Sequence, residues 1–154
     1  MIALKPITNI NLKTAIKVAR EIFPYEVHKD GFWPEVAYKQ SLEEKVPQFR
    51  YYLAYSKGKI VGITGHYPPD DTSSEMWLGW FGVRPSCRRK GYGKQILFAT
   101  AEIIVGFGYM KLFLYSGDRE EERNAHKLYL SVGFKQYKKG KVDGQPVLYF
   151  KAEI

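Results

Sequence analysis

The sequence has very little cysteine and histidine. Cys87 is the only cysteine, so no disulfide can form within the chain, and a lone thiol is typical of a reducing compartment. The three histidines have no spacing typical of metal ligands. The sequence also lacks an apolar run of membrane length and a signal-peptide pattern at its start. We therefore expect a cytoplasmic protein with no metal site and no membrane partner.

The composition of the 154 residues predicts a single domain over residues 1–154. Hydrophobic residues make up 45% of the chain and charged residues 26%, which suits a globular protein with a core. The net charge of +8 attracts polyanions: nucleic acid, a membrane surface or a phosphorylated cofactor.

The spacing of apolar residues predicts an α+β fold. We expect strands at 2–7, 49–55, 60–67, 77–83, 111–115, 134–138 and 146–151. Helices are expected from 9 or 11 to 20 or 22, from 34 to about 45, from about 91 to about 106, and over 120–132, with a loop over 23–31. Antiparallel strands come first, and a strand–helix–strand crossover follows.

A basic, glycine-rich turn separates the strand expected at 77–83 from the helix that follows. Pro85 ends the strand, because proline cannot continue a ladder. A turn of this kind presents free N–H groups at the positive end of a helix dipole, where phosphate binds readily. The turn consists of Arg88, Arg89, Lys90, Gly91, Tyr92, Gly93 and Lys94. The sequence therefore predicts an anion site here.

Three other glycine-rich motifs fit less well. A Walker loop requires Ser or Thr after Gly93-Lys94, and the chain has Gln95. A dinucleotide fingerprint requires a third glycine, where this chain has Ile96. Residues 90–93 match the start of an RNA-binding signature, but a helical pattern follows instead of an aromatic strand.

Two motifs resemble those of the GNAT superfamily of N-acetyltransferases. Arg88-x-x-Gly91-x-Gly93, after a strand ending in Val83-x-Pro85, resembles motif A, and residues 125–134 resemble motif B. The resemblance covers nearly the whole chain. It implies a layered fold with a mixed, mostly antiparallel sheet of six to seven strands and about four helices. It also implies acetyl-CoA as cosubstrate and a primary amine as acceptor.

The resemblance also assigns roles to residues. Backbone groups at Phe81, Gly82 and Val83 would hold the pantetheine arm and the acetyl carbonyl, and residues 88–94 the pyrophosphate. Tyr129 stands where the family places the general acid for the leaving thiolate, beside the cofactor. The family often has Asn seven residues before this tyrosine. Here that residue is Glu122, so Asn124, two residues on, is the weaker candidate for the cofactor contact.

The sequence does not decide which residue acts as the general base. Glu75 is the first candidate, because its even offset from Phe81 would place both side chains on one face of a regular strand. A solvated surface position explains Glu75 equally well. Asp118 and His66 are rivals.

Acidic and aromatic residues suggest a small cationic amine or polyamine as acceptor, with an aminoglycoside, a protein N-terminus or a lysine as alternatives. Asp70, Asp71 and Glu75 form an acidic segment in a basic protein. Aromatic candidates for the acceptor wall are Phe23, Tyr25, Phe32, Trp33, Tyr38, Tyr51, Tyr52, Tyr55, Tyr67, Trp77 and Trp80. Two alternative hypotheses for the function are a basic nucleic-acid-binding module and a non-catalytic acyl-CoA sensor. The helix after Gly93 argues against a nucleic-acid partner, and a homodimer stays open.

Overall fold

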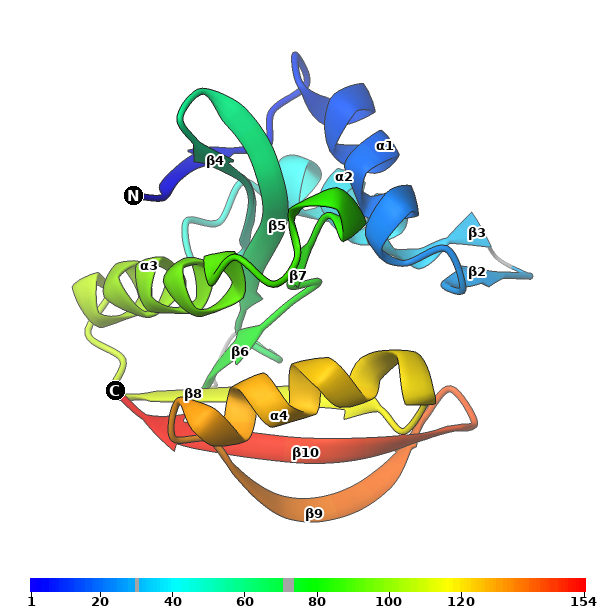
Figure 1. The fold of residues 1–154 in the computed structure, drawn as a ribbon, viewed down its shortest axis with the longest axis vertical. Helices are drawn as coiled ribbons and strands as arrows, with labels where there is room; N and C mark the ends of the chain where they lie inside the picture. Colours follow the sequence, from blue (N-terminus) through cyan, green and yellow to red (C-terminus); the bar gives the residue numbers. More distant parts are fainter. Residues whose placement is uncertain (30, 71–73) are drawn as a thin grey trace.

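The computed structural model describes residues 1–29, 31–70 and 74–154 (Figure 1). The first half of the chain contains β1 (Ala3–Pro6), α1 (Leu12–Ile22), β2 (Val27–His28), β3 (Gly31–Phe32), α2 (Trp33–Glu44), β4 (Arg50–Ser56) and β5 (Lys59–Tyr67). The second half contains β6 (Met76–Leu78), β7 (Gly82–Val83), η1 (Pro85–Cys87), α3 (Tyr92–Gly106), β8 (Lys111–Gly117), η2 (Glu120–Glu122), α4 (Arg123–Ser131), β9 (Lys135–Val142) and β10 (Gln145–Glu153). No helix in these ranges is both long and apolar enough to cross a membrane.

The main sheet has the strand order β1-β4-β5-β6-β8-β10-β9 in the described part of the chain, and the short β7 pairs with β5. Every pair in this sheet is antiparallel except β6 with β8, which is parallel. The predicted α+β fold, with its mixed and mostly antiparallel sheet, is confirmed.

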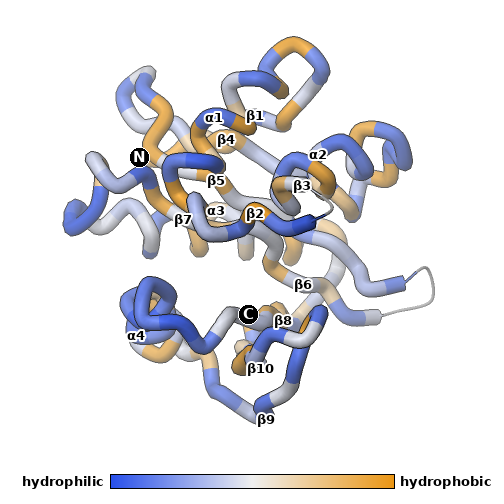
Figure 2. Tube along the Cα trace, turned by 90° about the vertical axis from the view of Figure 1, so that its right-hand side faces the viewer, coloured by the Kyte–Doolittle hydropathy of each residue, from blue (hydrophilic) through white to orange (hydrophobic). Residues whose placement is uncertain are grey.

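Helices cover both faces of the sheet. Apolar residues of α1 and α2, such as Val18 and Tyr38, pack with Leu53 and Ile63 of the central strands. On the other face, α3 and α4 enclose a second core that includes Ile104 and Tyr129. Figure 2 shows hydrophobic segments along α1, β4 and β5, whereas β9 is mostly hydrophilic. At about 25 cal/mol per Å² of apolar area, such burial is the main source of stability.

The strand expected at 77–83 is interrupted. It is two short strands, β6 and β7, because Trp80 takes a positive φ of 39° between them. β6 pairs with β8 only at Met76–Leu112 and Trp77–Phe113. Beyond that point the chain pairs with β5 alone, through β7. The sheet therefore splays open between β7 and β8.

Several element boundaries differ from the sequence expectation. The loop expected over 23–31 contains the short β2–β3 hairpin. The helix expected over 120–132 is divided into η2 and α4, and Gly133, with φ 106°, follows its end. The last two strands are longer than expected, reaching Val142 and starting at Gln145.

Candidate active site

Three adjoining cavities surround the splay. The loop groove, about 580 Å³, lies on the α3–α4 face and is lined by residues of β7, the basic turn and α4. The junction cavity, about 160 Å³, shares Phe23, Phe81, Ser116, Glu122 and Tyr129 with the loop groove. The aromatic pocket, about 650 Å³, is lined by α2 and β4 and shares Trp33, Leu78, Trp80 and Tyr115 with the junction cavity. The junction cavity therefore adjoins both the loop groove and the aromatic pocket.

The basic turn has the backbone shape of an anion site. Arg89 and Gly91 both take positive φ, 63° and 81°, on either side of Lys90. Alternation of this kind curls successive N–H groups toward one point. In the described part of the chain, the N–H groups of residues 89–94 donate to no backbone carbonyl, and the start of α3 has no side-chain cap. These unsatisfied donors are what a pyrophosphate requires.

Six of the seven residues predicted for the turn line the loop groove: Arg88, Arg89, Gly91, Tyr92, Gly93 and Lys94. Lys90 does not line it. Arg88 is held in place because its Nε donates to the Val83 carbonyl at 3.1 Å. Two arginines and one lysine therefore add positive charge to the backbone donors of the groove.

The edge of β7 supplies further backbone groups. The N–H of Arg84 donates to the Val61 carbonyl at 2.8 Å. Because bonding alternates along an antiparallel ladder, the N–H and C=O of Val83 face away from β5, toward the splay. Phe81, Gly82 and Val83 all line the loop groove. The Val83 carbonyl already accepts from Arg88, so the Val83 N–H is the group that this edge offers to an extended amide-containing ligand.

Two glycines of the groove serve packing. A Cβ at Gly82 would come within 2.4 Å of Ile22 Cγ2, so glycine lets the end of α1 approach β7. A Cβ at Gly93 would lie 2.8 Å from Leu128 Cδ2, so glycine lets α3 approach α4. Gly91 is different, because no atom lies within 4 Å of its would-be Cβ and only its positive φ requires glycine.

Tyr129 lies where the loop groove meets the junction cavity. Its ring is 5% exposed and has the rings of Phe81, Phe134 and Phe150 within 5.6–6.0 Å. Burial, and then the nearby Glu122 carboxylate, raise the pKa of the Tyr129 phenol well above its usual value. The phenol therefore keeps its proton at neutral pH.

The start of α4 brings both Glu122 and Asn124 to the loop groove. Glu122 also lines the junction cavity, whereas Asn124 does not. Burial, and then repulsion by Glu26, raise the pKa of the Glu122 carboxyl. Arg119 connects this region to the loop after α1, because its Nη1 lies 3.3 Å from Glu26 Oε1 and its guanidinium 4.9 Å from the centre of the Tyr25 ring.

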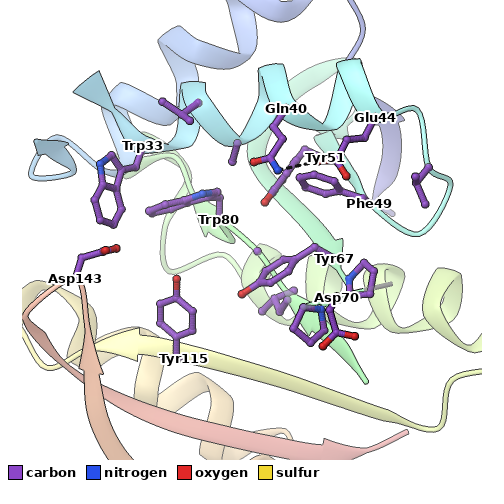
Figure 3. Close-up of a pocket in the computed structure, with 17 residues that line it drawn as sticks. Trp33, Gln40, Glu44, Phe49, Tyr51, Tyr67, Asp70, Trp80, Tyr115 and Asp143 are labelled. Atoms are coloured by element: carbon purple, nitrogen blue, oxygen red, sulfur yellow. Dashed lines mark hydrogen bonds between the residues drawn. The ribbon is translucent and has the colours of Figure 1, made fainter. Parts of the chain in front are cut away.

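Aromatic and acidic side chains line the aromatic pocket. Figure 3 shows Tyr115 pointing from β8 toward Trp80, with Trp33 and Asp143 beside them. The pocket's rings come from Trp33, Phe49, Tyr51, Tyr67, Trp80 and Tyr115, and its carboxylates from Glu44, Asp70 and Asp143. No lysine or arginine of the described residues lines it. In a protein of net charge +8, this pocket favours cations.

The aromatic candidates of the sequence divide between cavity and core. Trp33, Tyr51, Tyr67 and Trp80 line the aromatic pocket, Phe23 the junction cavity and Tyr25 the loop groove. The others lie elsewhere: Phe32, Tyr38 and Tyr52 are buried, Tyr55 contacts Lys5 on the outer strands, and Trp77 stacks on Phe113. Sequence reasoning missed Phe49, Tyr115 and three carboxylates: Glu26, Glu44 and Asp143.

The structure corrects the argument for Glu75. Trp77 stacks on Phe113, and the ring of Tyr137 packs edge-on against Phe113. Burial first, and the Glu75 carboxylate second, raise the pKa of Tyr137, so Glu75 lies near this group. Phe81 instead packs beside Tyr129. Glu75 and Phe81 do not share a face, because the break at Trp80 ends the regular alternation. Glu75 lines none of the three cavities in the described part, and Asp71 lies outside the described residues.

The other two candidates for the base have different surroundings. His66 is fully buried and uses both ring nitrogens. Its Nδ1 donates to the Gln48 carbonyl at 2.7 Å, so its Nε2 accepts from the Tyr52 hydroxyl at 2.8 Å. It lines none of the three cavities. Asp118 is exposed and lines the junction cavity.

Known proteins of the same fold share this arrangement of elements. A crystal structure of a putative acetyltransferase of the GNAT family from Desulfovibrio desulfuricans has a TM-score of 0.81 at 14% identity, covering 99% of each chain. A spermidine N-acetyltransferase chimera of Vibrio cholerae SpeG has a TM-score of 0.74 at 15% identity, covering 99% of this chain and 95% of that one. A GNAT acetyltransferase from Elizabethkingia anophelis, solved with acetyl-CoA bound, has a TM-score of 0.68 at 17% identity, covering 99% and 98%.

Likenesses this distant in sequence show the fold alone, and no curated protein sequence matches the chain. The family model supplies the stronger result. The acetyltransferase (GNAT) family model matches residues 12–134, which include the basic turn, the splay and Tyr129. The backbone donors and cations of the loop groove fit the pyrophosphate of the family's donor. The chain therefore belongs to the acetyltransferase (GNAT) family, and it is an N-acetyltransferase that uses acetyl-CoA.

Proposed function

We propose that this N-acetyltransferase transfers the acetyl group of acetyl-CoA to the primary amine of a small cationic molecule. The observation that carries this proposal is the lining of the aromatic pocket, with six rings, three carboxylates and no cationic side chain among the described residues. Aromatic faces and carboxylates are the groups that attract ammonium ions. The spermidine N-acetyltransferase of the same fold acts on a polyamine, which is consistent with such a substrate.

In this proposal the two substrates enter from opposite faces of the sheet. The loop groove holds the pyrophosphate at residues 88–94, apart from Lys90, and the pantetheine arm along Phe81 to Val83. The acceptor occupies the aromatic pocket, and its amine reaches the thioester through the junction cavity. Because both substrates are held before reaction, the attack needs no further loss of translational freedom.

Tyr129 is the proposed general acid. It lines both the loop groove and the junction cavity, and its raised pKa keeps the phenol protonated at neutral pH. The amine nitrogen attacks the thioester carbon, the C–S bond breaks, and the phenol gives a proton to the departing sulfur. Donation from a positioned acid avoids a free thiolate in an apolar site.

An amine panel tests the proposal. Purified protein with acetyl-CoA is offered polyamines, aromatic monoamines, amino acids and a peptide with a free N-terminus, and release of the CoA thiol is measured. We expect the highest kcat/KM for small amines that carry a second positive charge or an aromatic ring. A clear preference for anionic or neutral acceptors, or for the peptide, would contradict the proposal.

Thiol release, combined with thermal unfolding in the presence of each ligand, distinguishes the enzyme from the two alternative functions. A sensor would gain thermal stability with acetyl-CoA but release no thiol above background with any amine. A nucleic-acid-binding module would be stabilised by an oligonucleotide and not by acetyl-CoA. We expect stabilisation by acetyl-CoA, because a ligand bound only by the folded state raises its apparent stability.

A further inference from the structure

Glu122 is an unusual residue at the point where the donor and acceptor sides meet. It lines both the loop groove and the junction cavity, as does Tyr129. Its Oε2 atom is buried and has no hydrogen-bond partner among the described residues. Burying a carboxylate oxygen without a partner costs free energy, so packing alone gives no reason for a glutamate here.

The surroundings of Glu122 hold its carboxylate in this place. A Cβ at Gly117 would collide with that carboxylate, so glycine at the end of β8 makes room for it. The pKa of the Glu122 carboxyl is raised by burial first and by the Glu26 charge second. The Arg119 charge and hydrogen bonds from the backbone of Gly117 and Arg119 to the carboxylate lower it in part. Burial first, and the Glu122 charge second, raise the pKa values of the Tyr25 and Tyr129 phenols, so both lie near this carboxylate.

Glu26, the neighbouring carboxylate, is already engaged. Its Oε1 lies 3.3 Å from Arg119 Nη1, and its Oε2 lies 3.2 Å from His28 Nε2. Glu122 forms an ion pair with neither Arg119 nor His28 in the described part of the chain. Of the three carboxylates that line the junction cavity, those of Glu26, Asp118 and Glu122, only Glu122 has a buried oxygen with no hydrogen-bond partner among the described residues.

We propose that Glu122 is the general base that takes a proton from the ammonium group of the acceptor, an inference that rests on the proposed function. The nitrogen lone pair then forms a bond with the thioester carbon. The C–S bond breaks with its electron pair on sulfur, which receives the Tyr129 proton. The second proton that nitrogen loses on becoming an amide restores Tyr129, and Glu122 releases its own proton to solvent. One proton leaves in all.

The test compares Glu122→Gln with Glu120→Gln, using the best acceptor of the amine panel. Both changes remove one carboxylate from η2, but Glu120 is exposed and lines none of the three cavities. We expect kcat/KM at pH 7.5 to fall roughly 10²-fold in Glu122→Gln and to stay within about twofold in Glu120→Gln. The acidic limb of the pH profile should be lost only in Glu122→Gln.

A second acceptor separates proton removal from positioning. An analogue with a trifluoromethyl group on the carbon that carries the amine is neutral at the assay pH and needs no proton removed before attack. The deficit of Glu122→Gln should shrink at least tenfold with this analogue. An equal deficit with both acceptors, or full activity of Glu122→Gln with the parent amine, would overturn the assignment.

Failure of the proposed function has a different signature, because the wild-type protein itself would then release no CoA thiol.

A direct titration of the Glu122 carboxyl by ¹³C NMR does not depend on turnover. We expect Glu122 to take up its proton at a higher pH than an ordinary glutamate carboxyl does. Titration of Glu122 at the ordinary pH of a glutamate would overturn the inference, whatever the amine panel shows.

Discussion

The loop groove and the aromatic pocket are built in opposite ways. The groove takes most of its binding groups from the consecutive backbone of residues 81–94, with its shape fixed by Arg89 and Gly91 at positive φ. The pocket takes side chains from α2, β4, β5, β8 and the turn between β9 and β10. A backbone site suits a donor that is common to a family, whereas a side-chain site can change its specificity one residue at a time.

The largest expected effect concerns the point where the two regions meet. Tyr129→Phe keeps the ring among Phe81, Phe134 and Phe150 but removes the proton donor. We expect turnover to fall roughly 10²-fold or more, with little change in acetyl-CoA affinity. Calorimetry and single-turnover kinetics on a good acceptor check this. Full turnover in a chemistry-limited assay would make Tyr129 a packing residue only.

A change in the loop groove should affect the donor alone. Gly91→Val forces a β-branched residue to φ 81°, which costs about 1–3 kcal/mol of strain or a changed backbone. We expect acetyl-CoA to bind about 10- to 100-fold more weakly, measured by calorimetry.

Gly58→Val is the matched control for Gly91→Val. Gly58 has a similar φ of 77° in the β4–β5 turn and also has no atom within 4 Å of its would-be Cβ. The control should lose comparable stability but keep its acetyl-CoA affinity. Equal losses of affinity in both variants would mean that general strain, and not the anion site, explains the result.

A change in the aromatic pocket should affect the acceptor alone. Asn tolerates the positive φ of 51° at Asp143, so Asp143→Asn removes charge with little strain. We expect KM for a cationic amine to rise about threefold, as for a solvent-exposed charge, with unchanged acetyl-CoA affinity. The effect should disappear in high salt. Glu153→Gln, exposed at the end of β10, is the control and should leave KM unchanged.

The smallest expected effect lies outside both regions. Burial lowers the pKa of His66, so the folded state takes up a proton less readily than the unfolded state, whose histidine pKa is about 6.5. The stability that His66 contributes is present above pH 6.5 and is lost as pH falls below it. Denaturant unfolding should show at most ~1.4 kcal/mol lost per pH unit from this group. If this dependence of the unfolding free energy on pH disappears in Tyr52→Phe, the hydrogen bond from Tyr52 controls the protonation of His66.

The sequence predicted the loop groove better than the aromatic pocket for a physical reason. Glycine and proline punctuate the backbone locally, so the turn after Val83 and the start of α3 follow from adjacent residues. Six of the seven turn residues line the groove. Lys90 does not, because the orientation of one side chain depends on a backbone conformation that residue type does not specify.

The acceptor side depends on contacts between distant segments. Tyr115 and Asp143 line the aromatic pocket only because the sheet brings β8 and the β9–β10 turn opposite α2. The positive φ of Trp80 breaks the strand, and no glycine or proline at that residue marks the break. That break separates Glu75 from Phe81. One signal was available for Glu122, which occupies a position where related enzymes often have Asn.

Hydrogen–deuterium exchange with saturating acetyl-CoA tests most directly whether the two substrates occupy opposite faces of the sheet. The account predicts slower exchange in residues 81–94, where N–H groups would bind the donor, and unchanged exchange in residues 33–44 of the aromatic pocket. Protection of residues 33–44 with no change in residues 81–94 would contradict it.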